Sequence, residues 1–84
     1  MWKITIQVSG MMCGMCESHI NDTIRRTFSV KKVTSSHTKG QTVLVTQEDI
    51  PDEALREAIV QTGYEPGAIT REPYVKKGLF SFGH

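Results

Sequence analysis

The first residues of the chain alternate between apolar and polar side chains. Ile4, Ile6 and Val8 are separated by Thr5 and Gln7, and this period of two predicts a β-strand with one buried face. The Ser-Gly pair that follows is typical of the end of a strand. We therefore expect the chain to open with a strand.

The next apolar positions recur every fourth residue. From about Cys16 to Thr27 the sequence has Ile20 and Ile24 at this spacing, and Phe28 continues it, while charged and amide side chains fill most other positions. This pattern predicts an amphipathic helix with one apolar stripe toward the core.

Two further strands are predicted in the middle of the chain. Val30, Val33 and the β-branched residues after them indicate the first of these strands. The segment 41–46, Gln-Thr-Val-Leu-Val-Thr, indicates the second, and the sequence Thr-Lys-Gly at 38–40 predicts a hairpin turn between them.

The segment 41–46 has apolar residues on both of its faces, so its register decides which of them are buried. A slip of one residue would exchange the two faces of the strand. We expect Val43 and Val45 to face the core and Leu44 to face away from it.

The last third of the chain predicts a second helix and a final strand. The residues Ile-Pro-Asp-Glu at 50–53 indicate a helix start, because proline is tolerated in a first turn and acidic side chains are favoured there by the helix dipole. Gly63 ends the helix, and 68–70, Ala-Ile-Thr, form a short strand before Pro73. The inward stripe of this helix is Leu55, Ala58, Ile59 and Thr62.

The predicted order is strand, helix, strand, strand, helix, strand. This order is typical of the α+β ferredoxin-like βαββαβ fold, in which two helices cover one face of a four-stranded antiparallel sheet. A chain of 84 residues closes one hydrophobic core. We expect a single domain over residues 1–72 and a C-terminal tail over residues 73–84.

Composition and charge argue against several functional classes. Apolar residues make up 38% of the chain and charged residues 23%, the mixture of an ordinary folded protein. A net charge of +1 provides no field that would favour nucleic acid. The chain has no apolar run of about 18 residues and no secretory signal at its start, so we expect no transmembrane segment and a cytoplasmic location.

The two cysteines are the most informative residues. Cys13 follows the first predicted strand, and Cys16 lies in the opening turn of the first helix. Free N–H groups and the positive end of the helix dipole stabilise a thiolate there, so the pKa of such a cysteine falls below about 8.5. Two thiolates aimed at one point suit soft ions, Cu(I) and Hg(II) best, whereas a structural Zn(II) site usually needs four protein ligands.

Around the cysteines the chain resembles the heavy-metal-associated domain family, whose signature is Gly-Met-x-Cys-x-x-Cys followed by a helix. The Gly-Tyr pair at 63–64 also matches the pair before the last strand in bacterial copper chaperones, and the resemblance spans about residues 3–70. The residues that fit the signature are Gly10, Met11, Cys13 and Cys16.

This resemblance implies the ferredoxin-like fold and a soft metal ion, Cu(I) first, bound by Cys13 and Cys16. It implies delivery to a copper-transporting P-type ATPase or a copper-responsive regulator. An incoming thiolate of the partner would add to the metal before an original one leaves. The expected protein is a carrier and not an enzyme, monomeric or bridged into a dimer by the metal.

Four positions depart from the family's pattern. Met12 stands where copper domains often have Thr or Ser and zinc-exporting pumps often have Asp, and the missing acid disfavours Zn(II). Ser29 replaces a frequent glycine, and Ser35 and His37 replace residues that are usually apolar. We therefore expect the second strand to be less well packed than is usual in the family.

Five further residues are candidates for a role around the metal. Met11 is expected to pack beneath the loop, and Met12 and Met15 to form a soft apolar rim that contacts a partner. His19 lies one helical turn after the second cysteine, where it either reaches the metal or is solvated. By family analogy Tyr64 lies near the cysteines, where it restrains a metal-bound sulfur or packs against the helix end.

A function of a different class would use the same two cysteines. In a thiol–disulfide redox protein, Cys13 would be the nucleophile and Cys16 the resolving thiol. The thioredoxin-like fold needs a longer chain, and the central pair Gly14-Met15 resembles none of its usual dipeptides. The sequence therefore favours a metal carrier and keeps the redox protein and the Hg(II) or Zn(II) carrier as alternatives.

Overall fold

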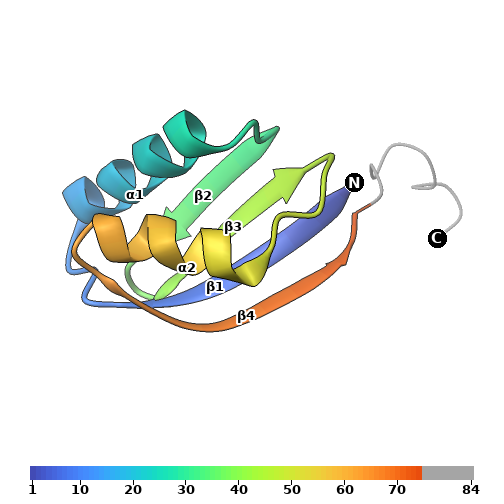
Figure 1. Cartoon of the computed structure of the whole chain (residues 1–84). Coiled ribbons are helices and arrows are strands. Elements are labelled where there is room, and N and C mark those ends of the chain that lie inside the picture. The colour runs from blue at the N-terminus through green and yellow to red at the C-terminus, as the bar shows by residue number, and fades with distance from the viewer. Residues whose placement is uncertain (75–84) are drawn as a thin grey trace, which may run out of the picture.

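The computed structural model of the chain describes residues 1–74 as a four-stranded sheet with two helices on one face (Figure 1). The sheet order is β2-β3-β1-β4, and every neighbouring pair of strands is antiparallel. This confirms the predicted ferredoxin-like fold. The elements are β1 (Trp2–Ser9), α1 (Gly14–Thr27), β2 (Lys32–Ser36), β3 (Gln41–Thr46), α2 (Asp52–Gln61) and β4 (Glu65–Pro73).

The core lies between the sheet and the two helices. The inward residues of β1 and the apolar residues within both helices are buried where the sequence periodicity predicted. Phe28 and Thr62, which end the two predicted stripes, are only half-buried and are the C-caps of the helices. Removing this apolar surface from water is the main favourable contribution to folding. The fully buried members are Ile4 and Ile6 of β1, Ile20 and Ile24 of α1, Leu44 of β3, and Leu55 and Ile59 of α2.

The predicted register of β3 is wrong. Leu44 is fully buried beneath the helices, opposite Ile4 of β1, whereas Val43 lies on the other face and is half-buried. Val45 is buried as well, but it pairs with Lys3 on the face of the sheet away from the helices. The two threonines of the segment occupy inward positions that the sequence pattern did not suggest for polar residues.

The last strand is longer than the segment 68–70 that the sequence indicated. β4 pairs with β1 from Ser9↔Glu65 to Trp2↔Pro73. Tyr74 then donates its backbone N–H to the carbonyl of Met1 at 2.9 Å. The strand thus includes Pro73, the first residue of the predicted tail, and the rest of that tail beyond Tyr74 lies outside the described residues. Over residues 1–74, neither helix is long and apolar enough to cross a membrane.

Candidate metal centre

The two cysteines lie at the end of the molecule away from the N-terminus, where β1 leads into α1 (Figure 1). Cys13 is the N-cap of α1 with an extended backbone, and its carbonyl accepts hydrogen bonds from the N–H groups of Cys16 at 3.1 Å and Glu17 at 3.3 Å. This first turn brings the two Sγ atoms to 4.0 Å from each other. The predicted placement of one cysteine before the helix and one in its first turn agrees with the structure.

The separation of the sulfurs suits an ion held between them. The midpoint of the 4.0 Å line is 2.0 Å from each sulfur, so an ion at the metal–thiolate bond length of about 2.3 Å from both would lie slightly to the side of that line. Among residues 1–74, no group of three or more His, Cys, Asp or Glu side chains is placed to share a metal. The donor set in this part of the chain is therefore two sulfurs, which suits a soft ion of low coordination number better than a closed zinc site.

The surroundings favour the thiolate form of Cys16. Its pKa is lowered to about 7, first by a backbone hydrogen bond from Met12, then by the Tyr64 hydroxyl and the Cys13 backbone. A hydrogen bond to the charged form of a group favours ionisation of that group. The same contact raises the pKa of Tyr64, because its proton is shared with the sulfur. A larger fraction of Cys16 than of an ordinary cysteine is thus thiolate at neutral pH.

Tyr64 reaches the site because α2 ends at a tight turn. Gly63 has φ +93, a left-handed conformation that glycine adopts without strain. The Tyr64 ring also packs against the loop after β1: a Cβ on Gly10 would lie 3.1 Å from Tyr64 Cδ1, and Gly10 has φ +103. A side chain at position 10 would therefore strain the backbone and would also require the Tyr64 ring to shift by a few tenths of an ångström.

Replacing Tyr64 by Phe is expected to raise the pKa of Cys16 above about 7, because the hydroxyl that stabilises the thiolate is lost. Alkylation at pH 7 should then slow, since the thiolate is the nucleophile. The measurement is the alkylation rate against pH for Tyr64→Phe and for its parent, both carrying Cys13→Ser so that one thiol remains. An unchanged profile would contradict a role of the hydroxyl.

The same pKa shift gives a pH dependence of stability. Folding lowers the pKa of Cys16 from 9.0 to about 7. The contribution of its thiolate to the free energy of unfolding is therefore fully present above pH 9 and is lost as the pH falls through 7. The free energy of unfolding should therefore increase as the pH rises from 7 to 9, and a Cys16→Ser variant should lack this increase.

The other candidate residues have different surroundings. Met11 is buried in the core beneath the loop. Met12 and Met15 are 79% and 82% exposed on either side of Cys13. His19 is exposed on the surface of α1. The structure thus brings Tyr64 to the cysteines, with Met12 and Met15 exposed beside them, while Met11 belongs to the interior.

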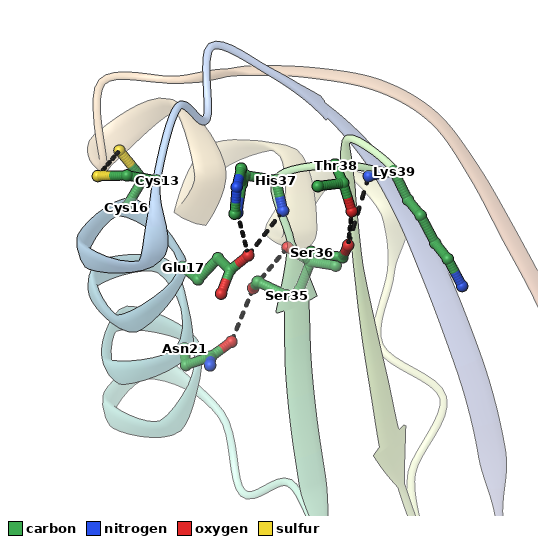
Figure 2. A network of polar contacts seen from close by, with 10 residues as sticks. Cys13, Cys16, Glu17, Asn21, Ser35, Ser36, His37, Thr38 and Lys39 are labelled. Carbon is green, nitrogen blue, oxygen red and sulfur yellow. Dashed lines mark hydrogen bonds and ion pairs between the residues drawn. The ribbon is translucent and has the colours of Figure 1, made fainter.

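A polar contact beside the second cysteine has no counterpart in the sequence pattern. Oε2 of Glu17 accepts two hydrogen bonds from His37, one from its backbone N–H at 2.8 Å and one from Nδ1 at 2.6 Å (Figure 2). These contacts lower the pKa of Glu17, the backbone hydrogen bond most. His37 lies in the turn just after β2, and its departure from the family's apolar pattern was the one available signal.

A second polar contact joins α1 to β2 itself, one helical turn farther along α1. The buried hydroxyl of Ser35 donates to Oδ1 of Asn21 at 2.7 Å (Figure 2). Thr42 Oγ1 lies 2.9 Å from the same hydroxyl. Since Ser35 donates to Asn21, Thr42 donates to Ser35. The inner face of β2 is therefore held partly by satisfied polar groups where the family usually has an apolar contact.

Comparison with known proteins points to one family. The model of the family described as "Heavy-metal-associated domain" matches residues 5–65. The chain is 32% identical over 67 residues to a mercuric reductase from Lysinibacillus sphaericus, a match that covers 80% of this chain and 12% of that protein. The chain thus spans about an eighth of the length of that relative.

Solved structures share the fold. A copper-binding domain from HMA7, a P-type ATPase, superposes with a TM-score of 0.76 at 24% identity, covering 87% of this chain and all of that domain. The N-terminal domain of PacS from Synechocystis PCC6803 gives a TM-score of 0.66 at 25% identity, covering 77% of this chain and 92% of that one. These similarities agree with the sheet order and the helix placement described above.

Proposed function

Since this chain belongs to the heavy-metal-associated domain family, we propose that it is a carrier that holds Cu(I) between Cys13 and Cys16. Members of this family bind and transport metal ions. The observation that supports Cu(I) most is the donor set: two thiol sulfurs 4.0 Å apart, with no cluster of three metal-ligating side chains among residues 1–74. Thiolates prefer Cu(I) to harder ions, and two ligands satisfy it.

An open two-sulfur site also suits release of the ion. Cys13 is exposed, and Cys16 is partly buried. A partner thiolate therefore approaches the metal from the side of Cys13, adds as a third ligand, and allows an original sulfur to leave. The proposed partner is a P-type ATPase domain with its own thiolate pair, or a copper-responsive regulator. The proposed location of this exchange is the cytoplasm, and no catalytic step on another substrate is involved.

Metal preference is the first test of this proposal. The reduced protein is titrated anaerobically with Cu(I) against a competing chelator, in parallel with Zn(II). We expect tight one-to-one Cu(I) binding that Zn(II) does not displace, because two thiolates leave Zn(II) short of its usual four ligands. Weak Cu(I) binding, or displacement by Zn(II), would overturn the proposal.

Met12→Asp is a matched variant for this experiment. Met12 is exposed beside Cys13, so the substitution adds a carboxylate oxygen near the sulfurs without disturbing the core. Oxygen ligands suit Zn(II) better than Cu(I). We expect the variant to gain Zn(II) affinity relative to the parent, which would show that the original site disfavours Zn(II) through its ligands.

Hg(II) is a second candidate cargo, favoured by the similarity to a mercuric reductase. Affinity measured in solution separates the two ions poorly, because Hg(II) also binds thiolate pairs tightly. The distinguishing experiment is the tolerance of cells that lack the protein to each metal. A loss of copper tolerance supports the Cu(I) carrier, and a selective loss of mercury tolerance supports the Hg(II) carrier.

A further inference from the structure

The turn between β2 and β3 makes hydrogen bonds to two elements that flank Cys13, β1 and α1. On one side, the backbone N–H and Nδ1 of His37 converge on the carboxylate of Glu17 (Figure 2). On the other side, the carbonyl of Gly40 accepts a 2.8 Å hydrogen bond from the N–H of Val8, close to the end of β1. One short turn thus braces both the strand before Cys13 and the helix that begins after it.

The contact with His37 acts on the residue next to a proposed ligand. Glu17 follows Cys16 in the chain, and both of their N–H groups bind the carbonyl of Cys13. The first turn of α1 is therefore held from two directions, by Cys13 within the helix and by His37 across to the sheet. Any rotation of this turn would move the Cys16 sulfur relative to the Cys13 sulfur.

The turn is also internally ordered. The hydroxyls of Ser36 and Thr38 lie 3.1 Å apart, and the N–H of Lys39 donates to Ser36 Oγ at 3.3 Å (Figure 2). An anchor of this kind holds its partner better than a flexible side chain does, because less conformational freedom is lost in forming the contact.

We propose that His37 is a positioning residue of the metal site: through Glu17 it fixes the first turn of α1 and holds the Cys16 sulfur at its 4.0 Å distance from Cys13. This inference rests on the proposed function, because it assigns the contact a consequence for metal binding. Supporting groups around metal ligands commonly set affinity in this way.

The chain contains a matched control for this proposal. Asn21 and Ser35 join the same helix to β2 itself, one turn farther from the cysteines than the contact of Glu17 with the turn after β2. Asn21→Ala removes that contact and leaves Ser35 bound to Thr42. His37→Ala removes the hydrogen bond from Nδ1 to Glu17 and keeps the one from the backbone N–H. If both side-chain contacts were purely structural, losing either would have equivalent effects, whereas a positioning role predicts an effect on the site from the His37 side chain alone.

The experiment compares His37→Ala, His37→Asn and Asn21→Ala in the full chain. Cu(I) affinity is measured by chelator competition, and amide hydrogen exchange of the first turn of α1 is measured in the metal-free protein. We expect His37→Ala to weaken Cu(I) binding about tenfold and to accelerate exchange at the Cys16 and Glu17 amides. His37→Asn should restore both, because its side-chain amide nitrogen occupies the position of Nδ1. Asn21→Ala should change neither.

Two results would overturn the proposal: His37→Ala indistinguishable from the parent, or Asn21→Ala weakening Cu(I) binding as much as His37→Ala does. The exchange measurement separates this test from that of the proposed function. If the parent bound no Cu(I), the carrier proposal would fail, and faster exchange in His37→Ala with rescue by His37→Asn would still support positioning of the turn.

Discussion

Replacing either cysteine alone by serine should lower the Cu(I) affinity by more than about a hundredfold, since loss of supporting groups beyond the ligands already costs about 10–100-fold. A hydroxyl is a hard, protonated donor at neutral pH and does not replace a thiolate for a soft ion. In Cys13→Ser and in Cys16→Ser, one sulfur of the pair remains. The measurement is anaerobic chelator competition at pH 7 on each variant and on the parent.

Met15→Leu is the control for these variants. Met15 stands between the two cysteines and is 82% exposed, so Leu preserves an apolar side chain and removes only the thioether sulfur. We expect its Cu(I) affinity to equal that of the parent. If Met15→Leu lost as much Cu(I) affinity as a serine variant, Met15 would be a thioether ligand of the site. If a serine variant bound Cu(I) within a few-fold of the parent, the two-thiolate site would be contradicted.

Leu44→Ala should lower the free energy of unfolding by about 3 kcal/mol, within the range measured for large-to-small changes in cores. Leu44 is fully buried beneath the helices, between Ile4 of β1 and Val33 of β2. Removing most of its side chain loses buried apolar surface and leaves a cavity. Val43→Ala, one residue away on the opposite face, should cost about 1 kcal/mol or less, because Val43 is only half-buried.

Urea unfolding of the two variants measures this difference directly. The midpoint should fall strongly for Leu44→Ala and slightly for Val43→Ala, with similar slopes if both unfold in one step. The reverse order would mean that the register of β3 is the one expected from the sequence, with the valines inward. The pair thus tests the side-chain direction along one strand.

Much of the fold was predictable because its signals are local. Ile4 and Ile6 are two residues apart, which reflects the geometry of a strand. Ile20 and Ile24 are four residues apart, which reflects the geometry of a helix, and each segment carries its own spacing. The placement of the two cysteines at the start of α1 was predictable for the same reason. Its spacing and its place at the start of a helix are properties of a few consecutive residues.

The register of β3 was not predictable in this way. The sequence Val-Leu-Val is apolar at three successive positions, so the pattern allows either face to be buried. The choice is made by pairing with β1, which sets Leu44 opposite Ile4 and Thr42 opposite Ile6. The length of β4 was decided likewise, since its pairing with β1 continues to Pro73 although the local pattern marked only its middle.

The sequence by itself therefore determined the order of the elements, the family signature and the two thiols that open α1. Only the tertiary structure decided which face of β3 is inward, how Tyr64 reaches Cys16, and that His37 contacts Glu17. These last two contacts join residues far apart in the chain, 48 and 20 positions respectively. Interactions at such separations depend on how the elements pack, and no periodicity within one segment encodes them.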